Sequence, residues 1–421
     1  MQSTIQPEAS PRIAFAERTA ALLVLSALLV LANGIGNASP YIYLVCLVLA
    51  WPFLLRDQNG RDAMKHPVGI GYLLAFACVA VGFAGSASSM EDVAHLGNFL
   101  PLILFFPAFA LFNRQANSNG TQVFALFALL GAGVALASAI YDVWWAGLDR
   151  AKGFVNLTNP FAMASIMLGF LPLMGLLTGK GPWRLIFLLG PVFGIMAGLL
   201  AGTRSAPLIA VVVSTIFAGF LFFRLPKRLR LIWVGAIILV VVSVILALFA
   251  FGDNLRALRG LDVIYSFITE GTVPDRSSEV RVQLYVGAIN AFLEAPIFGY
   301  GWYDHVEAGR QFMAPDVAEL VAGWSHYHND YLNFAALAGI FGLAFYALYL
   351  LLPIWGAFRS EHDGQFAARL YGAMTISATY GVHGLFNTAF GAELLFCFAP
   401  VATAVLLGYC KDQPTNRLPA R

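Results

Sequence analysis

The residues with the clearest chemical potential are one histidine, His328, and two arginines, Arg204 and Arg281. His328 stands in the stretch Trp-Ser-His-Tyr-His-Asn-Asp-Tyr, at the predicted non-cytoplasmic mouth of a long apolar segment. Ionisable side chains at membrane depth are costly and therefore mark candidate functional sites. Both arginines are predicted on the same side of the membrane. A base flanked by guanidinium groups predicts chemistry on an anionic substrate.

Arg281 is predicted to lie in the first turn of a helix. Ser277 or Ser278 is a suitable N-cap, and the helix would run to about Leu293. Free backbone N–H groups and the helix dipole favour anions at such a terminus, and the nearby Arg276 adds positive charge. In the alternative interpretation, Arg281 pairs with one of three neighbouring acids, Asp275, Glu279 or Glu294.

Arg204 is predicted between two membrane spans, because it follows Ala201-Gly-Thr and precedes an apolar run that begins at Ala206. A lone arginine at such a position often extends to lipid phosphates. The neighbouring residues are small, however, and this favours a guanidinium that lines a cleft. A planar, bidentate donor of this kind suits a phosphate group.

His328 is predicted to point into the protein. Steps of three and four residues place it on one helical stripe with Leu332, Ala335, Gly339 and Gly342. The small residues of this stripe allow a neighbouring helix to approach closely. A buried histidine that only satisfies hydrogen bonds is the alternative, and metal binding lacks support because no His, Asp or Glu follows at three or four residues. His326 would be a loop residue near the site or an interfacial group.

Composition indicates that an integral membrane protein holds these residues. Of the 421 residues, 59% are hydrophobic and 11% are charged, whereas soluble domains average about 45–50% and about 25%. The net charge of +2 gives no indication of nucleic-acid binding. The four cysteines have neither metal-ligand spacing nor a secreted-domain pattern, so we expect neither a disulfide nor a metal site.

Apolar runs dominate the chain, and about 20 helical residues suffice to cross the hydrocarbon core of a bilayer. Lys and Arg concentrate on alternate loops, most strongly in Arg224-Leu-Pro-Lys-Arg-Leu-Arg230, which places the N-terminus inside. We expect a single polytopic all-α domain over residues 1–421, with the first run as a retained signal-anchor. The twelve predicted spans are 20–36, 41–55, 68–86, 96–112, 121–141, 160–178, 183–201, 206–223, 231–251, 332–356, 366–386 and 391–409.

One extended segment, residues 252–325, lies outside the predicted spans and on the outer face. Loops longer than about 15 residues within a compact domain are usually functional. The sequence therefore predicts that this loop carries part of the active site.

Four motifs contain the candidate residues. The first is His328-Asn329 followed by Gly339 and Gly342, and the second is Gly202-Thr-Arg-Ser205. The third is Glu279-Val-Arg281 followed by Pro296-Ile-Phe-Gly-Tyr-Gly301, and the fourth is Lys152-Gly-Phe-Val-Asn-Leu-Thr-Asn159. The first two resemble the signatures of the bacterial O-antigen ligases, and the other two look like stretches of the wider O-antigen ligase and polymerase superfamily. The resemblance covers about residues 150–345 by motif and the whole chain by topology.

The resemblance implies a membrane glycosyltransferase of the GT-C type, with about 12 transmembrane helices and one large periplasmic loop. The donor would be a glycan on undecaprenyl diphosphate, and the acceptor of a ligase would be a sugar hydroxyl of lipid A-core in lipopolysaccharide biosynthesis. His328 would be the general base, with Arg204 and Arg281 on the leaving diphosphate, in an inverting reaction without metal or other cofactor. The implied substrate-binding residues are Lys152, Asn159, Arg276, His326 and Asn329.

The implied location is the bacterial inner membrane, with the lipid bilayer as a partner and the active site facing the periplasm. An O-antigen polymerase or a protein O-oligosaccharyltransferase would use the same donor chemistry. Secondary transporters also commonly contain twelve spans. Against transport, the polar groups of this chain cluster at one face instead of at the midplane.

Overall fold

The computed structural model describes residues 11–55, 58–87, 89–224, 226–228, 230 and 275–412. Within these ranges the chain is helical and forms no strand, so the predicted all-α class is confirmed. The α-helices are α1 (Pro11–Leu25), α2 (Ser39–Leu54), α3 (Gln58–Ala63), α4 (Pro67–Ser86), α5 (Met90–Ala94), α6 (Phe105–Arg114), α7 (Gly120–Ile140), α8 (Thr158–Phe170), α9 (Leu173–Thr178), α10 (Leu189–Leu200), α11 (Ser205–Arg224), α14 (Arg276–Glu294), α15 (Gly301–Arg310), α16 (Pro315–Leu320), α17 (Asp330–Arg359), α18 (Phe366–Gly384) and α19 (Glu393–Tyr409). Short 3₁₀ or π segments are η1 (Ser26–Val30), η2 (Gly36–Ala38), η3 (His95–Leu104), η4 (Tyr141–Trp145), η5 (Gly153–Val155) and η6 (Pro182–Leu188).

The chain is a multi-pass membrane protein. The helical segments of the described ranges that are long and apolar enough to cross a membrane are Ile13–Val30, Pro67–Ser86, Met90–Arg114, Gly120–Trp145, Thr158–Thr178, Pro182–Leu200, Ser205–Arg224 and Asp330–Arg359. Each overlaps a predicted span. The predicted spans at 41–55, 366–386 and 391–409 correspond to α2, α18 and α19, which are shorter or less apolar. The predicted span 231–251 and residues 252–274 of the predicted loop lie outside the described residues.

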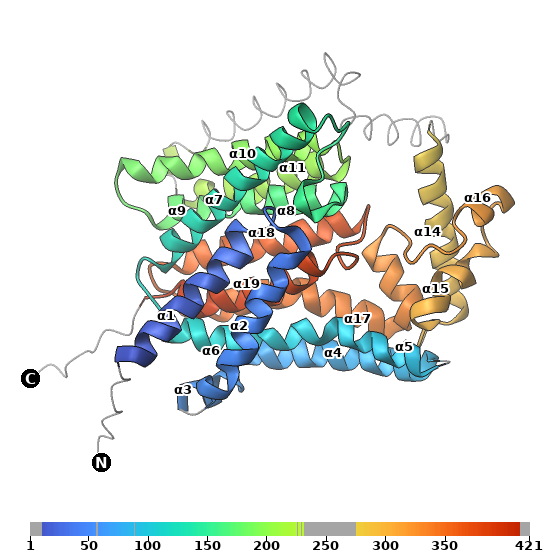
Figure 1. The fold of residues 1–421 in the computed structure, drawn as a ribbon, viewed down its shortest axis with the longest axis horizontal. Coiled ribbons are helices and arrows are strands. Elements are labelled where there is room, and N and C mark those ends of the chain that lie inside the picture. Colours follow the sequence, from blue (N-terminus) through green and yellow to red (C-terminus); the bar gives the residue numbers. More distant parts are fainter. Residues whose placement is uncertain are drawn as a thin grey trace, which may run out of the picture.

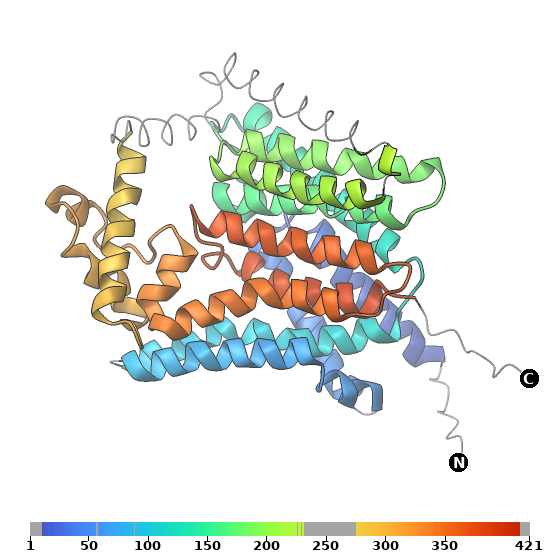
Figure 2. The same ribbon diagram turned by 180° about the vertical axis from the view of Figure 1, so that it is seen from behind.

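The long helices lie side by side in one bundle. α4, α6 and α17 run along one side, α7, α8, α10 and α11 run along the other, and α18 and α19 lie between them (Figures 1 and 2). Glycines allow the closest contacts. A Cβ added to Gly169 of α8 would lie 2.7 Å from the Cα of Gly194 in α10, so these two backbones can touch only because both residues lack a side chain.

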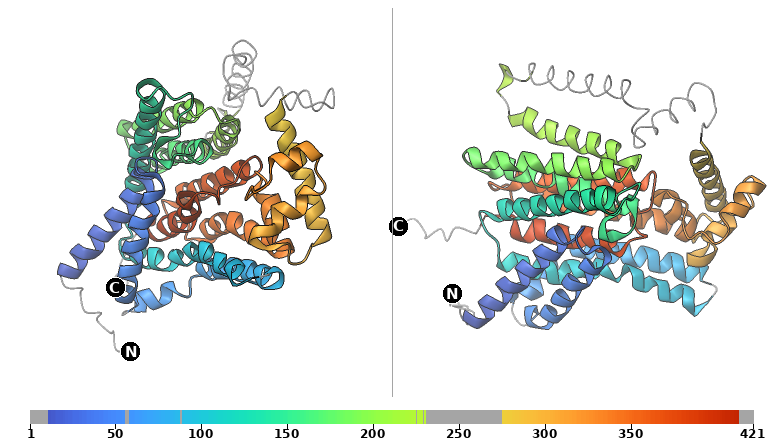
Figure 3. Two further views of the ribbon diagram at one scale, coloured as in Figure 1. Left: turned by 45° about the vertical axis from the view of Figure 1, so that its right-hand side comes forward. Right: turned by 45° about the horizontal axis from the view of Figure 1, so that its top comes forward.

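At one end of the bundle, α14, α15 and α16 form a separate layer, with α14 crossing the direction of α17 (Figure 3). We call residues 275–320 the α14–α16 layer. It has a small hydrophobic core that is distinct from the core of the bundle and includes Leu284, Val306 and Val317. Tyr327 is fully buried in this core, and its hydroxyl donates to the carbonyl of His305 in α15. The residue before His328 is thus anchored in the layer.

The α14–α16 layer is joined to the bundle at a break in α17. Gly339 has φ 61, which interrupts the helix and frees backbone groups on both sides. The loop 296–301 satisfies these groups, because Ile340 N–H donates to the Pro296 carbonyl at 2.8 Å and Tyr300 N–H donates to the Ala336 carbonyl at 2.9 Å. A Cβ on Gly339 would lie 2.3 Å from the Ile297 carbonyl oxygen, so glycine is required here. The loop therefore fixes α14 and α15 to the spanning helix that follows His328.

Candidate functional site

His328 lies in the loop immediately before α17. The predicted helical stripe from His328 through Leu332 to Gly342 is therefore wrong. The helix begins at Asp330, after the N-cap residue Asn329, whose Oδ1 accepts the Leu332 N–H at 3.1 Å. The helix is also interrupted at Gly339. His328 itself has φ 54. This left-handed conformation is uncommon for a residue with a side chain, and such conformations cluster at functional sites.

His328 and Arg281 line the same pocket, which has a volume of about 440 Å³. The other residues of the lining are Arg276, Ser277, Val280, Leu320 and Trp324. The His328 ring packs edge-on against Trp324, with centroids 5.4 Å apart, and against His326, with centroids 4.5 Å apart. The structure thus brings together the predicted base, one predicted arginine and two of the predicted binding residues, His326 and Arg276.

The imidazole of His328 is kept neutral by its surroundings. Burial, and then the neighbouring His326 and the Arg281 charge, lower the pKa of His328 to about 3. Burial also lowers the pKa of His326. A histidine in its neutral form can accept a proton from a bound hydroxyl. The pocket therefore holds a base that stays unprotonated at neutral pH.

Arg281 carries a charge that no acid of the described ranges neutralises by an ion pair or hydrogen bond. Other groups bind the three acids that could have paired with it. Asp275 binds Arg204, Glu279 binds Arg276, and Glu294 accepts hydrogen bonds from Tyr300 and Gln311. Burial lowers the pKa of the Arg281 guanidinium, yet arginine remains charged in proteins. The alternative of a structural ion pair at Arg281 is therefore not supported.

The helix that carries Arg281 begins earlier than predicted. Asp275 is its N-cap and accepts the Ser278 N–H with Oδ1 at 3.2 Å, so the predicted caps, Ser277 and Ser278, lie inside the first turn. Arg281 consequently falls in the second turn. Arg281 lines the pocket together with Arg276 and Ser277, which lie in the first turn.

Arg204 lies between α10 and α11, as predicted, but it does not line the His328 pocket. Its Nη1 and Nη2 atoms lie 3.2 and 3.3 Å from Oδ2 and Oδ1 of Asp275. Nη1 also donates to the hydroxyl of Ser278 at 2.8 Å. Arg204 therefore holds the first turn of α14, and it is near enough to Arg281 that its charge adds to the effect of burial in lowering the Arg281 pKa.

Lys152 lies in a stretch that runs beside Arg204. Its backbone N–H donates to Asp142 Oδ2 at 2.8 Å, and its side chain is partly exposed. Two residues earlier, Arg150 donates from Nε to the Ala201 carbonyl at 2.9 Å. The stretch that begins the predicted Lys152–Asn159 motif is thus fastened to the turn that holds Arg204. Arg150 was not found by sequence reasoning, because nothing in its spacing links it to residue 201.

The loop between α18 and α19 is a further part of the site that the sequence did not reveal. Asn159 donates from Nδ2 to Asn387 Oδ1 at 2.7 Å, and Asn387 Nδ2 lies 3.4 Å from the Ser205 hydroxyl. Thr388 donates to the buried carboxylate of Asp330 at 2.6 Å. This loop therefore connects the beginnings of α8, α11 and α17. The polar pair Asn-Thr between two apolar helices is the only sequence signal for it.

The remaining predicted binding residues have partners within the protein. Arg276 donates to Glu279 at 3.0 Å and to Asp316 at 2.6 Å. The Asn329 amide caps α17 and donates from Nδ2 to the Leu385 carbonyl at 3.1 Å. Arg276 lines the pocket and Asn329 follows His328 in the chain. A ligand that binds either side chain would have to replace these hydrogen bonds or share their donors and acceptors.

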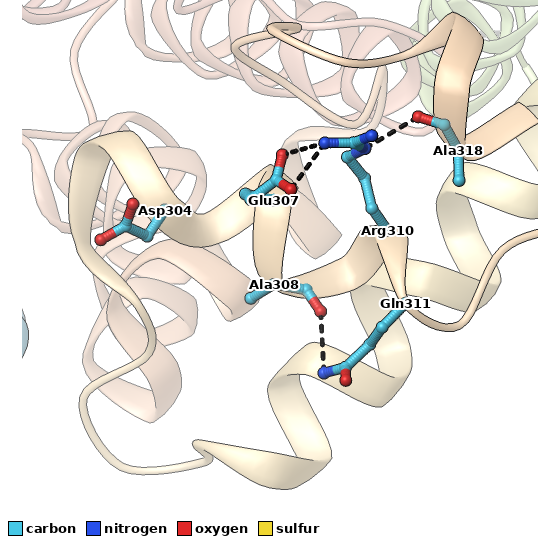
Figure 4. Close-up of a pocket in the computed structure, with 6 residues that line it drawn as sticks. All are labelled: Asp304, Glu307, Ala308, Arg310, Gln311 and Ala318. Carbon is cyan, nitrogen blue, oxygen red and sulfur yellow. Dashed lines mark hydrogen bonds and ion pairs between the residues drawn. The ribbon is translucent and has the colours of Figure 1, made fainter.

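A second pocket, of about 560 Å³, lies in the α14–α16 layer (Figure 4). Arg310 donates to Glu307 at 2.6 Å and to the Ala318 carbonyl at 2.8 Å, while Asp304 lies apart from this pair. Because Glu307 neutralises the only arginine of its lining, this pocket suits an anion less well than the His328 pocket. No group of three or more His, Cys, Asp or Glu that could hold a metal occurs in the part of the chain that the structure describes.

The bundle and the cationic, histidine-containing pocket at its end define a multi-pass membrane protein with a site beside its helix ends. Residues 189–347, which contain Arg204, Arg281 and His328, match the model of the O-antigen ligase family. The match supports membership of the O-antigen ligase/polymerase superfamily and confirms the predicted resemblance. An uncharacterized protein of Haemophilus influenzae is 27% identical over 167 residues, which are 39% of this chain and 41% of that protein. The match thus spans about two fifths of the length of this relative.

Proposed function

We propose that the protein is an O-antigen ligase that transfers a glycan from undecaprenyl diphosphate to a sugar hydroxyl of lipid A-core. The transfer would take place on the periplasmic side of the bacterial inner membrane. The observation that carries the proposal is the shared pocket of His328 and Arg281, where a neutral base and a guanidinium that forms no ion pair with an acid of the described residues line the same space. The family match supports the substrate class, a lipid-linked glycan.

The base activates the acceptor. A sugar hydroxyl is a weak nucleophile, so His328 takes its proton as the oxygen forms a bond to the anomeric carbon of the donor. The bond from that carbon to the diphosphate oxygen breaks, and its electron pair leaves with the diphosphate. Attack from the opposite face inverts the anomeric centre. His328 then releases the proton to water.

The arginines stabilise the leaving group. Negative charge grows on the diphosphate as its bond breaks, and preplaced guanidinium groups in a partly dry pocket lower the energy of that charge. Arg281 is the first candidate because it lines the pocket. Arg204 lies behind the first turn of α14. It can contact the diphosphate only when its bonds to Asp275 are exchanged for bonds to the donor. Lys152 and Arg276 would add positive charge at the margin of the site, with Asn159, His326 and Asn329 as further polar contacts.

The test is reconstitution of the reaction from purified components. The full-length protein in detergent is incubated with an undecaprenyl-diphosphate glycan and lipid A-core, and the products are separated by gel electrophoresis. A ligase yields lipid A-core that carries the glycan. The same incubation with a second lipid-linked glycan as acceptor detects polymerase activity instead. If neither acceptor is extended, while the protein remains folded and monodisperse, the proposed function is wrong.

A further inference from the structure

Tyr285 connects three elements of the site. It lies four residues after Arg281 on α14, so the two side chains share one helix face. Its hydroxyl oxygen lies 3.1 Å from the Leu385 carbonyl oxygen, which follows α18, and 3.4 Å from the carbonyl oxygen of His328. The helix that presents Arg281 therefore also contacts the backbone of the residue that we propose as the base.

The Leu385 carbonyl also receives a second donor. Asn329, the residue after His328, donates to it from Nδ2 at 3.1 Å. Burial raises the pKa of Tyr285, although the Arg281 charge and a hydrogen bond with the Asn329 side chain act in the opposite direction. The phenol consequently keeps its proton at neutral pH and acts as a donor. Tyr285, which contacts the His328 carbonyl, and Asn329, which follows His328 in the chain, therefore both bind the Leu385 carbonyl.

The backbone of His328 requires such support. Its φ of 54 is unfavourable for a residue with a Cβ, and such conformations persist only where the surroundings hold them. The neighbouring N-cap fixes Asn329 but leaves the His328 carbonyl outside the helix. Among the hydrogen bonds of the described residues, that carbonyl receives one from Tyr285 alone.

We infer that Tyr285 is a positioning residue, which holds the His328 imidazole at a fixed distance from Arg281 by sharing its one hydroxyl hydrogen between the Leu385 and His328 carbonyls. The expected effect of Tyr285 on catalysis rests on the proposed function. The restraint on His328 is a separate property, and it can be measured without any turnover. A base displaced by about 1 Å loses much of its contribution to the reaction rate, because proton transfer requires the base and the hydroxyl to lie within hydrogen-bond distance.

The experiment compares Tyr285→Phe with wild type and with Tyr303→Phe in the full-length protein. Phe keeps the ring and removes only the hydroxyl. Tyr303 is the matched control, since its hydroxyl contacts His95 outside the pocket. The first readout is the rate at which diethyl pyrocarbonate modifies His328, followed by mass spectrometry, with the exposed His362 as an internal reference, because neither substitution touches it. The second is the division of any activity loss between kcat and KM.

We expect Tyr285→Phe to increase the modification rate of His328 at least threefold and to lower kcat at least tenfold, with KM for the donor within twofold of wild type. Tyr303→Phe should change neither. An unchanged modification rate at His328 would overturn the inference, whether or not kcat falls. If the wild-type protein extends neither acceptor in the reconstituted reaction, the proposed function fails, but the modification rates still decide whether Tyr285 positions His328.

A second variant covers the case in which Tyr285→Phe does not fold. Incorporation of 3,5-difluorotyrosine at position 285 keeps the hydroxyl, but this phenol loses its proton much nearer to neutral pH. At pH 6 the variant and the wild type should show the same rate of His328 modification relative to His362. At the alkaline pH where absorbance shows the phenol to be ionised, and therefore unable to donate, His328 of the variant should be modified faster than His328 of the wild type. Equal rates of variant and wild type at both pH values would contradict the inference.

Discussion

Arg204 and Asp275 meet in a two-pronged ion pair, with Nη1 3.2 Å from Oδ2 and Nη2 3.3 Å from Oδ1. A carboxylate and a phosphate offer a guanidinium the same arrangement of two oxygens. Burial alone would raise the pKa of Asp275, but the hydrogen bonds from Ser278 and Arg204 outweigh it and hold the pKa below its usual range. Asp275 is therefore ionised at neutral pH and occupies the position that a donor diphosphate would need in order to reach Arg204.

Asp275→Asn should consequently tighten donor binding. Asn is as good an N-cap as Asp, so the start of α14 is preserved while the competing charge is removed. We expect KM for the lipid-linked donor to fall at least threefold, with kcat within twofold of wild type. Glu307→Gln, which neutralises the carboxylate bound to Arg310 outside the pocket, is the control and should leave KM unchanged. A rise in KM would show that Asp275 orients Arg204 for the donor instead of competing with it.

His328→Asn should abolish transfer without unfolding the protein. Asparagine tolerates the left-handed backbone of this position better than alanine does, so the substitution removes the imidazole and leaves the loop in place. A general base typically contributes about 10²–10⁴-fold to a rate, and we expect a loss of kcat in that range. His95→Asn is the matched control. Activity near the wild-type level, at equal amounts of membrane-inserted protein, would exclude His328 as the base.

Arg281→Lys should remain strongly impaired, with at least a tenfold loss of kcat/KM. An ammonium keeps the charge but cannot donate two parallel hydrogen bonds to a diphosphate. Arg204→Lys should be impaired as well, and should also loosen the first turn of α14. Arg310→Lys, in the second pocket, is the control and should retain activity. Full activity of Arg281→Lys would mean that this residue contributes only electrostatic attraction.

The plot of kcat/KM against pH should lack the fall on the acid side that the protonation of an ordinary histidine causes. Because the pKa of His328 is lowered to about 3, its neutral form is fully present well below pH 6.5. The titratable and charged groups around it are His326, whose ring packs against it, Arg281 and Arg276 in the pocket, and Tyr285 on α14. We expect kcat/KM to stay level from pH 8 to pH 5. In Arg281→Gln this fall should move to higher pH, since a neighbouring positive charge is lost. A fall centred near pH 6.5 in the wild type would contradict the neutral, buried base.

Transfer should proceed unchanged in excess EDTA. Three acids of the described residues, Asp92, Asp142 and Asp330, are occupied by hydrogen bonds within the protein. Asp92 forms a capping box with Ser89, Asp142 accepts two backbone N–H groups, and Asp330 binds Thr388 and a backbone N–H. Purified components are needed, because chelation also loosens lipopolysaccharide packing in whole membranes. Loss of turnover that Mg²⁺ or Mn²⁺ restores would overturn the arginine mechanism.

Hydrophobic periodicity predicts the spanning helices well, because each apolar run must be buried in lipid or in the bundle. It fails at helix starts. The stripe through His328 extended a helical period across Asn329-Asp330, although an Asn before an apolar run is itself a signal for an N-cap. At α14, Asp275, Ser277 and Ser278 are all good caps. The choice of Asp275 coincides with its ion pair to Arg204, a contact between distant parts of the chain that no local pattern contains.

The same limit explains which site residues were missed. Arg281 and His328 could be predicted to share a site because ionisable residues in an apolar chain are few. Tyr285 and Asn387 act through bonds to residues 100 and 182 positions away. Tyrosine is common near membrane interfaces, and asparagine is common in loops, for other reasons. Their roles become visible only when α14, α17 and α18 are placed together.

The break in α17 bears on the order in which the chain can be completed during synthesis. An interrupted helix exposes N–H and C=O groups that lipid cannot satisfy. The loop 296–301 that binds them precedes Gly339 in the sequence, so these partners leave the ribosome before the groups that need them. The backbone groups that close the break have therefore already been synthesised when α17 emerges, so this helix can be completed before the helices that follow are added.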